Sequence, residues 1–180
     1  MKKIFSVSLL IAVLAFSNLV FASNKGENPF GEDLNTDEML LGNLKMFTDG
    51  NIVKQRYGSP NWGRIGGNNQ CGYGDSVILH FSDNKLVKIV VSQNNGWTTP
   101  KGIAVGMSIE VVTKMYGEPC LRESAENFSN IAYIYRSATR DGSPSLVFVF
   151  DKKNRLIQRI IITSELDEVA ARNITEFLKN

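Results

Sequence analysis

The stretch Gly102-Ile-Ala-Val-Gly-Met-Ser-Ile-Glu-Val-Val-Thr-Lys-Met-Tyr-Gly-Glu-Pro119 decides the fold, because it predicts a short amphipathic helix with a defined start and end. Ser108 is a favourable N-cap, since its hydroxyl can accept a hydrogen bond from a backbone N–H of the first turn. Gly117 can adopt a left-handed C-cap, and Pro119 cannot continue the helix. Apolar residues share one face of this helix at i, i+3 and i+7: Ile109, Val112 and Tyr116.

The same pattern occurs earlier, in Asp49-Gly-Asn-Ile-Val-Lys-Gln-Arg-Tyr-Gly-Ser-Pro60. Asp49 takes the place of the serine cap, and Tyr57-Gly58-Ser59-Pro60 supplies the same ending. Helices this short are unstable alone in water, so each needs a sheet to cover. We therefore predict buried side chains at these positions: Ile52, Val53, Tyr57, Val112 and Tyr116.

Strand–turn–strand patterns follow both helices. We expect strands at 76–81 and 86–92 after the first helix, and at 131–137, 145–150 and 155–163 after the second, where Arg159 indicates a bulge. The Gly- and Asn-rich residues 61–74 predict a loop with at most a short strand. The prediction is an α+β fold of two tandem helix-plus-antiparallel-sheet units, residues 39–93 and 102–163, joined by a linker over 94–101.

The N-terminus is typical of an exported protein. Lys2 and Lys3 precede an apolar stretch over 4–21, and Val20-Phe21-Ala22 is a signal-peptidase pattern, so residues 1–22 are expected to be a signal peptide. The alternative is an uncleaved membrane anchor. Removal of Lys2 and Lys3 leaves equal numbers of basic and acidic residues, so a nucleic-acid partner is not indicated. We expect a soluble periplasmic or extracellular protein without stable membrane insertion.

Three further segments complete the organisation. Residues 23–38 are polar and are expected to form a flexible lead-in. Residues 39–47 fit either a short helix or an extended segment. Ser164 is a helix cap, and the apolar stripe that follows predicts a C-terminal helix over 164–180 that packs against the sheet or the partner unit: Leu166, Val169, Ala170, Ile174 and Phe177.

Two cysteines occur in the chain, Cys71 and Cys120. Export permits a disulfide, and we predict that the two are bonded. The alternative is a pair of separate thiols. Their spacing does not form a zinc site, and no metal or cofactor is expected.

His80 is the single histidine, in the middle of an expected strand. A general base needs a partner and a pocket, and the local sequence supplies neither. A packed or sheet-surface histidine is therefore favoured, and the protein is expected not to be an enzyme. A small secreted hydrolase using His80 is the alternative.

Aromatic residues are the better candidates for a binding surface. Tyr133 and Tyr135 share one face of a strand, and Trp62 and Tyr73 lie in the Gly-rich segment. Such rings are favoured anchors at protein interfaces. Either these rings are exposed for binding or they complete the core.

The helix ending in Tyr-Gly-x-Pro, preceded by Gly-Ile-x-Val-Gly-Met-Ser, resembles a known superfamily. It is similar to the small outer-membrane assembly lipoproteins of the SmpA/OmlA (BamE-like) type and to the β-lactamase-inhibitor protein. The resemblance implies a repeated helix-plus-sheet unit with a sheet face that binds protein, and carries over no catalytic residue. We expect a non-catalytic binding protein with a protein partner; an enzyme inhibitor and a purely structural envelope component are further readings.

Overall fold

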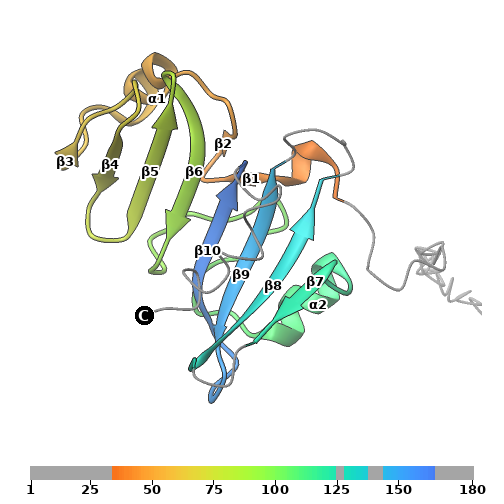
Figure 1. Ribbon diagram of the computed structural model, residues 1–180. Helices are drawn as coiled ribbons and strands as arrows, with labels where there is room; N and C mark the ends of the chain where they lie inside the picture. Colours follow the sequence, from red (N-terminus) through yellow and green to blue (C-terminus); the bar gives the residue numbers. More distant parts are fainter. Residues whose placement is uncertain (1–33, 125–127, 138–143, 165–180) are drawn as a thin grey trace, which may run out of the picture.

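The computed structural model describes residues 34–124, 128–137 and 144–164 (Figure 1). The expected signal peptide and nearly all of the expected C-terminal helix lie outside these residues. Among the described residues, no helix is long and apolar enough to cross a bilayer.

A single antiparallel sheet dominates the fold, with strand order β3-β4-β5-β6-β10-β9-β8-β7 (Figure 1). Its strands are β3 (Trp62–Gly63), β4 (Gln70–Tyr73), β5 (Val77–Ser82), β6 (Lys85–Val91), β7 (Leu121–Glu123), β8 (Asn130–Arg136), β9 (Ser145–Asp151) and β10 (Ile157–Thr163). The predicted strands are present, and the register of β10 on β9 shifts between Ile157 and Arg159, which confirms the predicted irregularity. The mixture of two helices with a large antiparallel sheet is that of an α+β fold.

The sheet has two halves, each made of a helix and the four strands that follow it. The first half is α1 (Gly50–Tyr57) with β3–β6, and the second half is α2 (Ile109–Tyr116) with β7–β10. The strands of the two predicted units form one continuous sheet, because β6 pairs with β10 across the middle, for example Val91 opposite Ile160. This pairing joins two strands that would otherwise be exposed edges.

Both helices begin and end where their caps predict. Asp49 accepts a hydrogen bond from the Asn51 N–H at 2.9 Å, as an N-cap should. Ser108 occupies the N-cap of α2 but makes no capping hydrogen bond. Its side chain instead hydrogen-bonds the Glu110 carboxylate, and this is the main reason why the pKa of Glu110 is lowered. Both N-cap positions are therefore as predicted, although only Asp49 makes the expected capping hydrogen bond.

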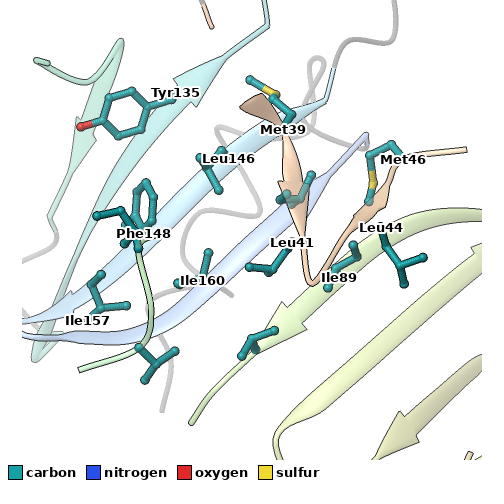
Figure 2. Close-up of a cluster of buried hydrophobic side chains, with 14 of the residues drawn as sticks. Met39, Leu41, Leu44, Met46, Ile89, Tyr135, Leu146, Phe148, Ile157 and Ile160 are labelled. Atoms are coloured by element: carbon teal, nitrogen blue, oxygen red, sulfur yellow. The ribbon is translucent and has the colours of Figure 1, made fainter. Parts of the chain in front are cut away.

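One face of the sheet packs against both helices and an N-terminal hairpin. The hairpin consists of β1 (Leu40–Leu41) and β2 (Leu44–Lys45), which resolves the ambiguity of 39–47 in favour of an extended segment. Its apolar side chains Leu41 and Leu44 belong to the same buried cluster as Ile89 of β6 and Ile160 of β10 (Figure 2). Before it, a 3-10 turn, η1 (Thr36–Glu38), is held by a capping box between Asn35 and Glu38, so this end of the expected flexible lead-in has defined structure.

The predicted helix faces are largely correct. Val53, Val112 and Tyr116 are buried in this core, and Tyr57 is half-buried. Ile52 is 47% exposed, so its predicted burial is wrong. It lies next to Val53 along α1, about 100° around the helix, and so points away from the sheet.

Candidate binding site

Tyr73 and Tyr135 have a structural role, because each hydroxyl bonds to the end of a helix. The Tyr135 hydroxyl donates to the Gly117 carbonyl at 3.0 Å, and the Tyr73 hydroxyl donates to the Gly58 carbonyl at 3.0 Å. Both acceptors are the residues that end a helix. Each tyrosine thus satisfies a carbonyl that the end of its helix leaves without a partner; we call these two contacts the tyrosine latches.

The rings of the latches also pack on the tyrosine that precedes each helix-ending glycine. The ring centroids of Tyr116 and Tyr135 lie 5.5 Å apart, and those of Tyr57 and Tyr73 lie 6.0 Å apart. Tyr135 is fully buried and Tyr133 is 8% exposed. Tyr133 and Tyr135 therefore belong to the core, which is the second of the two alternatives that the sequence left open for these rings.

Trp62, by contrast, is 42% exposed on the edge strand β3. Its indole lies directly over Gly72 on β4: a Cβ added to Gly72 would come within 2.1 Å of Trp62 Nε1. Because Gly72 has no side chain, the indole ring can pack directly on the backbone of β4. One side of the indole is supported by backbone while the rest is open to solvent, a geometry suited to stacking against a partner.

A hollow lies near the same edge of the sheet, and Gly63, the residue after Trp62, is part of its lining. It has a volume of about 630 Å³, and its lining consists of Gly63, Arg64, Asn68, Asn69, Gln70, His80, Phe81, Ser82 and Val87. Gln70 stands directly opposite His80 in the β4–β5 pair, and the Arg64 N–H donates to the Gln70 carbonyl at 3.1 Å. The pairing of three neighbouring segments therefore brings these residues together.

The loop that forms one wall of the hollow is held by side-chain hydrogen bonds. Asn69 Nδ2 donates to the Gly66 carbonyl at 2.9 Å, and Asn68 Oδ1 accepts from the Asp83 N–H at 2.8 Å in the β5–β6 turn. Gly66 has a φ of +85°, and a Cβ there would lie 2.1 Å from Asn84 Oδ1. The wall is thus preorganised, which lowers the entropic cost of binding.

The chemistry of the hollow favours binding. Arg64 makes no ion pair with any residue of the described part of the chain, so its guanidinium can receive a carboxylate. The described lining holds neither a carboxylate nor a cysteine. Within the described residues, no group of three His, Cys, Asp or Glu side chains could hold a metal ion.

We call Trp62, Arg64, Gln70 and His80 the edge site. Trp62 and His80 were singled out by the sequence, whereas Arg64 and Gln70 were missed. Alternation along the strands could have found them, because Arg64 lies two residues after Trp62 and Gln70 two residues before Gly72.

The predicted disulfide is absent. Both cysteines are free thiols: Cys71 is buried in β4, and burial raises its pKa to about 11, while Cys120 is partly exposed next to β7. β4 is the second strand from one edge and β7 is the opposite edge. With neighbouring strands about 4.8 Å apart, the two residues are far beyond the Cα separation of about 7 Å that a disulfide tolerates.

Comparison with known proteins assigns this chain to no family. No family model matches the sequence, and no curated protein matches it. One similar structure is an extracellular protein containing an SCP domain from Bacillus anthracis strain Ames, with 13% identity and a TM-score of 0.48 over 79% of this chain; the chain spans about half, 51%, of that protein. Another is a DUF4309 family protein from Bacillus subtilis strain 168, with 18% identity and a TM-score of 0.43, covering 64% of this chain and 78% of that one.

Proposed function

We propose that this chain is an exported, non-catalytic binding protein of the cell envelope or exterior that recognises a protein partner at the edge site. The observation that carries the proposal is the supported but exposed indole of Trp62 beside the hollow that contains Arg64. Aromatic and arginine side chains dominate the energetics of protein interfaces. The partner segment is expected to carry a carboxylate for Arg64 next to an apolar or aromatic side chain for Trp62.

We further propose that the two halves are tandem copies of one unit, as the resemblance to the assembly lipoproteins and the β-lactamase-inhibitor protein implies. The tyrosine latches support this, since each half has one. The helix starts agree as well: the Gly50 N–H donates to the Asn84 carbonyl at 2.9 Å, and the Ile109 N–H donates to the Arg155 carbonyl at 3.0 Å. In each half the helix start is bonded to the turn of the last hairpin.

The residues of the edge site occur in the first half of the sheet and have no counterpart in the second half. The proposed binding of a partner therefore depends on the first half. The strand that corresponds to β3 in the second half is β7, which carries Leu121 and Arg122 where β3 carries Trp62 and Gly63. Such a difference is expected if the helix and strands that the two halves share are structural, and if the residues on the outer strand of the first half are functional.

Affinity capture from an envelope extract tests the function, with three baits. The unaltered protein and the control Val111→Ala, which trims an apolar residue that is 40% exposed on α2, should capture the same partner. The double variant Trp62→Ala/Arg64→Glu should not. Capture by all three baits would overturn the edge site, and a turnover abolished by His80→Ala in a folded protein would replace binding with catalysis.

A further inference from the structure

Phe47 holds a backbone conformation that an aromatic residue rarely adopts. Its φ is +64°, in the left-handed region, where a bulky side chain is an outlier. It is the third residue of a four-residue turn, which the Thr48 N–H closes on the Lys45 carbonyl at 3.4 Å. A turn with a positive φ at its third residue usually has glycine there. Phe47 is also 52% exposed, so packing in the core does not explain an aromatic residue at this position.

The second half of the sheet has glycine at the equivalent position. Gly106 has a φ of +91° in the turn before α2. Both turns are bonded to the last hairpin of their half in the same way: the Phe47 N–H donates to the Leu86 carbonyl at 2.7 Å, and the Gly106 N–H donates to the Ile157 carbonyl at 2.9 Å. The fold therefore does not need an aromatic residue here. Backbone strain that glycine would relieve is typical of functional positions.

Other exposed residues lie on the same segment as Phe47. Ile52 is 47% exposed on α1, and Arg56 lies one turn further along the same side of the helix. Arg56 Nη1 donates to the Asn43 carbonyl at 2.7 Å, which joins the end of α1 to the turn of the β1–β2 hairpin. The exposed Lys45 follows two residues after Asn43. We call Lys45, Phe47, Ile52 and Arg56 the turn patch.

The cations of the turn patch have no counterion among the described residues. Neither Lys45 nor Arg56 forms an ion pair in that part of the chain. Asp49 is the one carboxylate of residues 43–56, and it is already bonded to the Asn51 N–H and to Lys85. The turn patch thus combines exposed apolar side chains with unpaired positive charge, and its electrostatic complement is an acidic surface.

We propose that the turn patch binds an acidic protein surface, with Phe47 in an apolar pocket and carboxylates facing Lys45 and Arg56. This second interaction surface goes beyond the proposed function, since none of its residues belongs to the edge site. The rigid presentation of Phe47 favours a protein over a lipid bilayer. The Leu86 N–H donates to the Thr48 carbonyl at 2.9 Å and so fixes the turn from its other side. A fixed ring lowers the entropic cost of entering a pocket, whereas a bilayer has no shape for it to match.

Photo-crosslinking from position 47 in the living cell tests the proposal, because benzoylphenylalanine keeps the phenyl ring of Phe47. One discrete adduct with another protein is expected, and mass spectrometry should find acidic residues in the crosslinked peptide. Lys45→Glu, which reverses an exposed charge, should lower the yield of this adduct at least about fivefold. The matched change Trp62→Ala/Arg64→Glu, which removes the edge site, should leave the yield unchanged.

The contrary outcomes are distinct. No adduct, a lipid adduct, a crosslink to a second copy of this chain or a peptide without carboxylates would each overturn the proposal. So would a yield that Lys45→Glu leaves unchanged or that Trp62→Ala/Arg64→Glu abolishes. Crosslinking from position 62 reports on the edge site separately, so a failure of the turn patch is distinguishable from a failure of the proposed function.

The strain at Phe47 has its own test in the purified protein. Phe47→Gly and Phe47→Ala both remove the ring, but only glycine relieves the left-handed backbone. Phe47→Gly should therefore melt about 2–4 °C above Phe47→Ala. At a position with an ordinary φ the order is reversed, because glycine costs more conformational entropy than alanine. A melting temperature of Phe47→Ala equal to or above that of Phe47→Gly would remove the strain on which the proposal rests, and would overturn it.

Discussion

The hydrogen bond of the second tyrosine latch gives a prediction with a built-in control. In Tyr135→Phe the ring remains and only the hydroxyl that bonds the Gly117 carbonyl at 3.0 Å is lost. Gly117 is exposed, so water can replace part of this bond. The free energy of unfolding should therefore fall by about 0.5–1.5 kcal/mol, the net worth of a neutral hydrogen bond.

Tyr116 is the control, because its hydroxyl is buried without a hydrogen-bond partner in good geometry. Burial raises the pKa of Tyr116 to about 12, although the side chain of Thr99 and the backbone of Lys101 act in the opposite direction. Removing an unsatisfied buried hydroxyl should be neutral or stabilising, by up to about 1 kcal/mol. Tyr116→Phe and Tyr135→Phe are chemically identical changes in touching rings, yet they should differ in sign or at least in size.

Urea unfolding of the two variants and the unaltered protein measures the difference, with a shift of midpoint at constant slope as the criterion of a change in stability. Tyr135→Ala provides the scale, because truncation of a fully buried aromatic residue should cost about 3–5 kcal/mol. A neutral Tyr135→Phe, or a Tyr116→Phe that costs as much, would refute the latch.

Three other predictions follow from separate features. A thiol reagent should modify Cys120 alone in the folded protein, because Cys71 is buried with a pKa of about 11; no reactive thiol before or after unfolding would restore the disulfide. The pKa of Asp49 is lowered, first by the Asn51 N–H and then by Lys85, so the stability it adds is present above pH 3.8 and lost as pH falls below that value. The stability difference from D49N, measured by urea midpoints, should shrink over that range, and a difference that grows would contradict it. The intact mass of the exported protein should correspond to cleavage after Ala22, and a species that retains Lys2 would disprove the signal peptide.

The features predicted correctly from the sequence are the local ones. The bounds of α1 and α2 follow from a cap at one end and a glycine at the other, both within a few residues. The strands of the two main hairpins follow from β-branched alternation and turn residues. The bulge predicted at Arg159 is matched by the register shift between Ile157 and Arg159.

The features that were missed depend on long-range pairing. The joining of β6 to β10 cannot be read from either strand alone, because both are apolar on both faces. The short strands β3 and β4 could not be recognised because they contain glycines, which lower strand propensity. At position 72 a glycine is required, because a Cβ there would clash with the Trp62 ring. The burial of Tyr133 and Tyr135 was undecidable locally, since alternation shows that two residues share a face without showing which face is covered.

The most direct test of the edge site is photo-crosslinking in the living cell. The photoreactive residue benzoylphenylalanine is placed at position 62, where the exposed Trp62 ring lies over Gly72, and, as a control, at position 111 on the exposed side of α2. We predict one discrete adduct from position 62 that Arg64→Glu abolishes, and no such adduct from position 111. An adduct of the same mass from both positions, or none from position 62, would contradict recognition of a protein partner at the edge site.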